Sequence, residues 1–164
     1  MCIRDSSIGV YIYDVATLET LHLIETEARV LDIAFSPDGS TLALVLDDGN
    51  STLYLREMNE GASLRVLTSN LVSLAFSPDG TILAAGLADG VVELWRANDW
   101  TLLRTLKDRS ASVLSMAFSP DGTILAAGMG FEDSSVQLWR VSAVSYTHLR
   151  AHETVLDLVC RLLL

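Results

Sequence analysis

The chain has 164 residues, half of them hydrophobic, and its formal net charge is −10. This length and hydrophobic content allow one domain with a buried core and argue against disorder. Ser, Asp or Gly interrupts every apolar stretch before it reaches the roughly 20 residues that span a bilayer. Because acidic residues are spread along the chain, we expect neither a nucleic acid nor an anionic membrane as partner. A basic or neutral partner would fit this charge. Solubility alone is the alternative explanation for it.

The two ends of the chain differ from the rest. Met1–Ser6 reads MCIRDS, which ATG TGT ATA AGA GAC AGT encodes, and this resembles the transposase adapter of sequencing libraries. The opposite strand of that adapter encodes Val144–His148, and the primers that follow it in such libraries encode much of the remainder, including Leu158–Leu164. We therefore interpret residues 1–6 and 144–164 as translated adapter.

The C-terminal end nevertheless carries suggestive patterns. His148 and His152 stand at i and i+4, a spacing that could hold zinc on one helical face, and the leucines recur at helical intervals. A non-native helix is expected there, without a selected function. Both cysteines, Cys2 and Cys160, also fall in these ends, so the natural part offers no disulfide framework and no clue to its redox compartment.

The natural part, residues 7–143, opens with GVYIYDVATLETLHLI at 9–24. This stretch predicts two short strands that match the last two strands of the units that follow. We expect an all-β chain of antiparallel units with four strands each. The predicted units are a half unit, two full units and one incomplete unit, at residues 7–28, 29–69, 70–110 and 111–143.

One twelve-letter segment defines these units. AFSPDGTILAAG occurs at Ala75–Gly86 and again at Ala117–Gly128, and a looser copy, AFSPDGSTLALV, occupies Ala34–Val45. Each copy begins with an alternating stretch, such as LVSLAFS at 71–77, whose period of two residues predicts a strand. Second and third strands are predicted to follow in each copy, and the two full units add a fourth (63–67 and 101–106).

Ser-Pro-Asp-Gly ends the first strand of each copy. Pro presets φ at the second position of a type I turn, Asp bonds to local amides, and Gly takes the left-handed conformation that closes a hairpin. We therefore interpret these residues as turn chemistry and not as metal ligands or catalytic acids. They are Pro37, Asp38, Gly39, Pro78, Asp79, Gly80, Pro120, Asp121 and Gly122.

The segment AFSPDGTILAAGLADGVVELW at Ala75–Trp95 resembles a WD repeat, and the resemblance extends over residues 7–142. It implies a partial β-propeller: about two full blades plus two incomplete ones. Members of that family act as platforms for other proteins. The chain departs from the family pattern, because the Gly-His pair before the first strand is absent and the closing Trp-Asp reads Trp95-Arg96 and Trp139-Arg140. The family's usual His–Asp–Trp hydrogen-bond network therefore cannot form here.

An incomplete arc of blades cannot close into a ring. We expect exposed apolar faces at both ends and an unpaired edge on the last unit. Expressed alone, residues 7–142 should therefore aggregate, exchange strands or assemble, and the remaining blades of a full propeller would be natural partners.

Three functions are compatible with these features. The first is a non-catalytic protein-interaction scaffold. The second is a sensing or docking propeller in a larger enzyme or signalling protein. The third, a catalytic or ligand-binding propeller, is disfavoured because the natural part has one histidine, His22, and no cysteine. We expect no enzyme activity, no metal and no cofactor; the cytoplasm is slightly favoured, but the sequence does not fix the location.

The family resemblance implies one face for partners, formed by the turns after the second and fourth strands. A basic peptide would suit this face, since it is mostly acidic; solvated turns are the alternative. Trp100 could anchor a partner, although core packing is favoured. The candidate partner-binding residues are Glu25, Glu27, Asp48, Asp89, Arg109 and Asp133. We expect the same face to include Asp47, Lys107 and Glu132.

Overall fold

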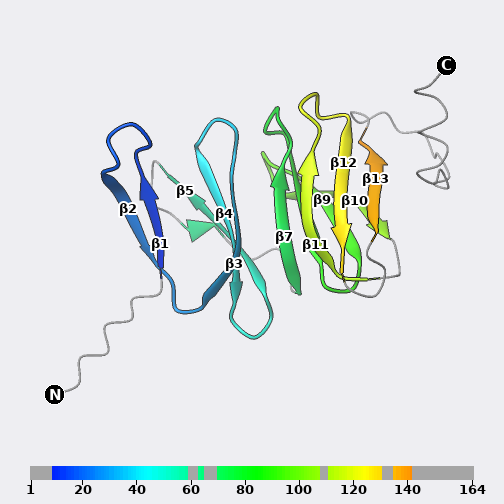
Figure 1. Ribbon diagram of the computed structural model, residues 1–164, viewed down its shortest axis with the longest axis horizontal. Coiled ribbons are helices and arrows are strands. Elements are labelled where there is room, and N and C mark those ends of the chain that lie inside the picture. The colour runs from blue at the N-terminus through cyan, green and yellow to red at the C-terminus, as the bar shows by residue number, and fades with distance from the viewer. Residues whose placement is uncertain (1–8, 59–62, 65–69, 108–110, 131–134, 142–164) are drawn as a thin grey trace.

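A computed structural model of the chain describes residues 9–58, 63–64, 70–107, 111–130 and 135–141. These residues form thirteen β-strands and no helix (Figure 1). The all-β prediction is therefore confirmed for the described part. The helix expected within 144–164 lies outside the described residues.

The strands form four antiparallel sheets, which we call sheets A to D. Sheet A contains β1 (Gly9–Tyr13) and β2 (Thr20–Glu25). Sheet B contains β3 (Arg29–Phe35), β4 (Thr41–Asp47), β5 (Thr52–Glu57) and β6 (Ser63–Leu64). Sheet C contains β7 (Leu71–Phe76), β8 (Ile82–Leu87), β9 (Val91–Arg96) and β10 (Thr101–Lys107). Sheet D contains β11 (Val113–Phe118), β12 (Ile124–Met129) and β13 (Val136–Arg140).

The four sheets stack in chain order, and one hydrophobic cluster fills each gap between neighbours (Figure 1). Strand β4 shows how one strand serves two gaps. Its even-numbered leucines, such as Leu44, pack against Val10 and Ile24 of sheet A. Its odd-numbered residues, Ala43 and Val45, belong to the cluster shared with sheet C. Successive side chains of a strand point to opposite faces, so a strand between two sheets is apolar throughout.

Small residues allow close approach between sheets C and D. A Cβ placed on Gly86 would lie 2.6 Å from Cγ1 and 2.9 Å from Cβ of Val113 in β11. No real side chain fits that space, so the backbone of β8 needs glycine at this point. The gap between sheets C and D is thus fixed by the absence of a side chain.

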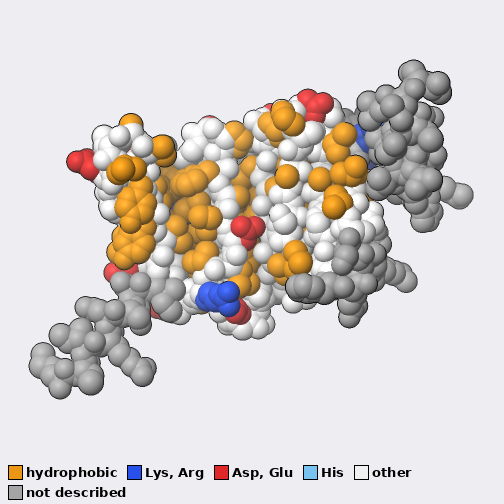
Figure 2. All heavy atoms as spheres, viewed as in Figure 1, with side chains coloured by type: hydrophobic (Ala, Val, Ile, Leu, Met, Phe, Trp, Pro, Cys, Tyr) orange, Lys and Arg blue, Asp and Glu red, His pale blue; other side chains and the backbone are white. Residues whose placement is uncertain are grey.

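The end of the stack at sheet A exposes large apolar side chains among the described residues. Tyr11 and Tyr13 stack on each other, with ring centroids 6.3 Å apart, and they are 50% and 54% exposed. In β3, Ile33 and Phe35 are 47% and 46% exposed. Figure 2 shows the hydrophobic side chains gathered at this end of the molecule. The described part of sheet A provides two strands, which cover only part of the face that sheet B turns toward it.

Candidate interaction surface

The three Ser-Pro-Asp-Gly turns lie along one rim of the stack (Figure 1). A Cβ on Gly80 would lie 3.4 Å from Cδ of Pro37, and one on Gly122 would lie 3.5 Å from Cδ of Pro78. Consecutive turns are therefore neighbours in space. Each turn closes through a glycine in the left-handed region, with φ of 71° at Gly39, Gly80 and Gly122.

Each turn is built around its aspartate. In the second copy the Ser77 hydroxyl donates to Asp79 Oδ1 at 2.6 Å, and the amide of Thr81 donates to the same oxygen at 3.0 Å. The amide of Ile82 donates to Ser77 Oγ at 2.9 Å. The other two copies repeat this arrangement around Asp38 and Asp121.

These hydrogen bonds change the acidity of the turn aspartates. The Ser36 hydroxyl, followed by the amide and hydroxyl of Ser40, lowers the pKa of Asp38 to about 2. The corresponding bonds, led by the serine hydroxyl, lower the pKa of Asp79 and of Asp121. Because each carboxylate already accepts bonds from its own turn, it serves the local structure.

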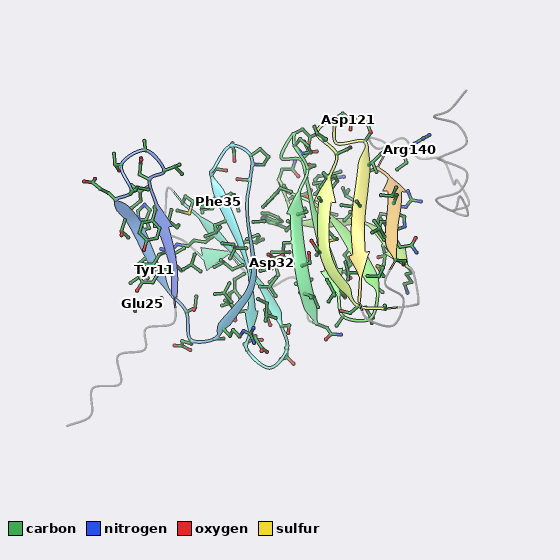
Figure 3. All side chains as sticks on the ribbon, in the orientation of Figure 1. Tyr11, Glu25, Asp32, Phe35, Asp121 and Arg140 are labelled. Carbon is green, nitrogen blue, oxygen red and sulfur yellow. The ribbon has the colours of Figure 1, made fainter. Side chains whose placement is uncertain are left out.

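The opposite rim carries five exposed acidic residues on the described turns, which we call the acidic rim: Glu25, Glu27, Asp47, Asp48 and Asp89. They lie at or just after the ends of β2, β4 and β8. Because neighbouring strands are antiparallel, these ends lie at the rim opposite the Ser-Pro-Asp-Gly turns. Glu25 is labelled at this edge in Figure 3. Among the described residues, the one ion pair joins Arg96 and Asp99, at 3.1 Å, so none of the five carboxylates is paired with a cation there.

Asp48 has the most elaborate surroundings of the five. Its carboxylate accepts bonds from the Thr52 hydroxyl at 3.0 Å, the Asn50 amide at 3.1 Å and the Tyr54 hydroxyl at 3.3 Å. The Thr52 hydroxyl, ahead of the Asn50 amide, lowers the pKa of Asp48. Desolvation, and then the charge of Asp48 and its hydrogen bond, raise the pKa of Tyr54, with a smaller contribution from the charge of Glu27.

Two turns of the acidic rim, those that carry Asp48 and Asp89, are linked by backbone hydrogen bonds. The amide of Leu71 donates to the carbonyl of Ser51 at 3.0 Å, and the amide of Ala88 donates to the carbonyl of Asn70 at 2.9 Å. The turn before β5 is thereby linked to the turn before β9 across two sheets. The sequence-predicted Asp48 and Asp89 thus lie on turns that hydrogen bonds link across sheets B and C, and Lys107 is exposed at the end of β10.

The remaining candidates differ in their position. Arg109, Glu132 and Asp133 lie outside the described residues. Trp100 packs against the cluster between sheets B and C, in the core role that the sequence favoured. His22 is exposed on β2. Trp95 Nε1 donates to Glu93 Oε2 at 3.2 Å within its own strand.

Asp32 is a residue that the sequence reasoning missed. Its Oδ2 accepts the backbone amide of Leu74 at 2.7 Å, which joins β3 of sheet B to β7 of sheet C (Figure 3). Its Oδ1 accepts the amide of Ile33 at 2.8 Å. The available signal was the odd acidic residue at a position where the other copies have Ser73 and Ser115.

The stacked antiparallel sheets define the class of the molecule: a repeat protein built from β-propeller blades. Residues 61–96 and 100–140 match the family described as WD domain, G-beta repeat. These two segments of the chain are therefore WD repeats. Such repeats generally mediate protein–protein interaction, and domains made of them are typically non-catalytic. A search of curated proteins found no similar sequence.

The described residues contain no group of three or more His, Cys, Asp or Glu side chains that could hold a metal ion. They also contain no helix of the length and hydropathy that crossing a membrane requires.

Proposed function

We propose that the chain is a non-catalytic interaction scaffold that presents the acidic rim to a basic, extended segment of a partner protein. The observation that supports the proposal is that five exposed carboxylates from three sheets lie on one rim, with no ion-pair partner among the described residues. Lysine and arginine side chains spaced along an extended peptide can reach several turns at once. Complementary charge mainly increases the association rate and the specificity of such a contact.

The carboxylates of the two rims differ in how their oxygens are used. The turn aspartates of the other rim use their oxygens within their own turns. Glu25 and Glu27 lie exposed, and the charge of Glu27 reaches Tyr54 and the neighbourhood of Asp48. Asp48 also accepts bonds from its own turn, but these bonds lower its pKa and it remains an exposed charge. A cation placed between Glu27 and Asp48 would interact with both carboxylates, so this pair is the proposed centre of the surface.

The test compares two double charge reversals. Glu25→Lys with Glu27→Lys changes the acidic rim, whereas Glu19→Lys with Glu57→Lys changes the charge by the same amount near the other rim. The probe is a fluorescent peptide of alternating lysine and serine, followed by anisotropy at low and moderate salt. We expect the first variant to bind about tenfold more weakly, since an exposed ion pair contributes roughly 0.2–1 kcal/mol and several are lost.

Salt and the control determine the outcome. Binding to the wild type should weaken as the ionic strength rises, because the rim is exposed and its charges are screened. Equal losses in the two variants would show that only net charge attracts the peptide. That result, or the absence of binding to the wild type, would overturn the proposed role of the acidic rim.

A further inference from the structure

The chain repeats one reactive dipeptide, Asp-Gly, at several turns. An Asp-Gly step can rearrange through a cyclic imide, because glycine has no side chain to keep its amide nitrogen away from the aspartate carboxyl carbon. The reaction needs that nitrogen to be accessible and free of other bonds, so the fold decides which steps can react. The five steps are Asp38–Gly39, Asp48–Gly49, Asp79–Gly80, Asp89–Gly90 and Asp121–Gly122.

Three of these glycine amides belong to the Ser-Pro-Asp-Gly turns and are already bonded. The amides of Gly39, Gly80 and Gly122 each donate to the carbonyl of the serine three residues earlier, at 2.8, 2.9 and 2.8 Å. This bond must open before the nitrogen can attack a carboxyl group. The folded state therefore protects all three steps.

The step at Asp89 is protected by burial as well as by a bond. The Gly90 amide donates to the Leu87 carbonyl at 3.2 Å, and Gly90 is buried although Asp89 is exposed. The bond is longer than those of the Ser-Pro-Asp-Gly turns, so we expect it to protect its step less strongly than they do.

The remaining step, in the turn between β4 and β5, lacks both forms of protection. Within the described residues the Gly49 amide has no hydrogen-bond acceptor. Asp48 and Gly49 are both exposed. Gly49 has φ of 94°, and a Cβ placed on it would meet no described atom within 4 Å. The nitrogen of Gly49 is thus the one among the five that is both unbonded and open to solvent.

The carboxyl groups do not separate the steps in this way. A hydroxyl group, followed by a backbone amide, lowers the pKa of Asp48. The same arrangement lowers the pKa of the three turn aspartates, Asp38, Asp79 and Asp121. The difference between Asp48 and these three residues therefore lies in the glycine amide.

We propose that Asp48–Gly49 is a site of spontaneous aspartate isomerisation, with water as the only co-reactant. The Gly49 nitrogen attacks Cγ of the Asp48 carboxyl group and loses its proton, while the Cγ–O bond breaks and the hydroxyl group leaves as water. Water then adds to the α-carbonyl carbon of the cyclic imide, and the bond from that carbon to nitrogen breaks. The product is isoaspartate, in which the backbone runs through Cγ and the α-carboxylate carries the charge.

This product changes the turn without changing its charge. Isoaspartate adds one carbon to the backbone after residue 48. It also moves the carboxylate away from the Thr52 hydroxyl and the Asn50 amide, which donate to it at 3.0 and 3.1 Å. The Asn50 carbonyl accepts the amide of Asn70, so the change reaches the link between sheets B and C. Isomerisation is thus a slow covalent alteration of one turn of the acidic rim.

The test maps isoaspartate in the full chain during incubation at mildly acidic pH and physiological temperature. Trypsin places Asp38 and Asp48 on one peptide, residues 30–56, and electron-transfer fragmentation identifies isoaspartate at each position. We expect Asp48 to isomerise at least about fivefold faster than the three turn aspartates, because their glycine amides must first lose a hydrogen bond. Asp89 should react at an intermediate rate.

Incubation in urea is the control for the intrinsic reactivity of the dipeptide. Unfolding should bring the five rates together, and the folded sample is incubated until the unfolded one has reacted. In a second control, Asp48→Glu retains the charge but would need a larger, less favourable ring. It should abolish isomerisation at residue 48 and leave the other four rates unchanged.

Two outcomes would refute the proposal. One is equal rates at the five steps of the folded chain, or a faster reaction at a Ser-Pro-Asp-Gly turn. The other is reaction in urea with none at Asp48 in the folded chain. Because the mapping requires no bound partner, its result is independent of the proposed role of the acidic rim.

Discussion

The segments Ala75–Gly86 and Ala117–Gly128 have the same sequence and different surroundings. Their turns are nearly identical: Gly80 and Gly122 both have φ of 71°, and in each the serine hydroxyl donates to the turn aspartate. Their burial differs. Ala84 is fully buried, whereas Ala126 is only partly buried. The strand that follows shows the same contrast, with Val92 0% and Val136 57% exposed.

This comparison separates what a local sequence determines from what neighbours determine. The turn depends on residues within six positions, so both copies form it equally. Burial of the outward face depends on the next sheet: sheet D covers sheet C, and within the described residues no sheet covers sheet D. Identical residues should therefore differ in their contribution to stability.

The largest expected difference is at the two equivalent glycines. Gly86→Ala should lower the free energy of unfolding by about 1–3 kcal/mol, because the new methyl group would overlap Val113 and force the sheets apart. Gly128→Ala should be nearly neutral in the monomer, since its Cβ would be 3.9 Å from the nearest neighbouring atom. Urea denaturation at protein concentrations where the chain is monomeric measures both.

Equal effects of these two substitutions would break the comparison. They would mean that glycine affects stability through the conformational preference of the strand itself, and not by allowing the close approach of sheet D.

The fold was largely predictable from the sequence because its signals are local. The alternation of LVSLAFS and the Ser-Pro-Asp-Gly turns each involve a few neighbouring residues, so strands and corners could be located. Exposure of individual positions could not be read in the same way. Ile33 and Leu74 occupy equivalent strand positions, and only the preceding sheet makes one exposed and the other buried.

The site was less predictable than the fold. The family resemblance indicated which turns share a rim, but the connection of those turns through Asn70 and Ser51 depends on loop conformation. The bond between Asp32 and Leu74 joins residues 42 positions apart, and no local pattern indicates it. Contacts between sheets are therefore the part of the molecule that the sequence alone does not reveal.

A smaller difference is expected at that contact between sheets B and C. Asp32→Ala should cost about 1–2 kcal/mol, because the amide of Leu74 loses a partly buried, charged acceptor. Asp32→Asn retains an acceptor oxygen and should cost less. Native-state hydrogen exchange of the Leu74 amide, followed by NMR, reports the bond directly. Protection of this amide that is unchanged in Asp32→Ala would show that the bond contributes little.

The smallest effect concerns acid stability, where the two identical copies should agree. The folded state lowers the pKa of Asp79 and Asp121, and that of Asp38 to about 2. The resulting stability is present above about pH 4, the ordinary pKa of aspartate, and is lost as the pH falls toward 2. Asp79→Asn and Asp121→Asn should each reduce stability at neutral pH by a similar small amount, and their difference from the wild type should shrink on acidification.

Urea midpoints measured across this pH range test this prediction, with Glu19→Gln as the control. A difference that persists at the acidic end would assign the effect to the shape of the side chain, whereas unequal differences would show that sheet coverage extends to the turns.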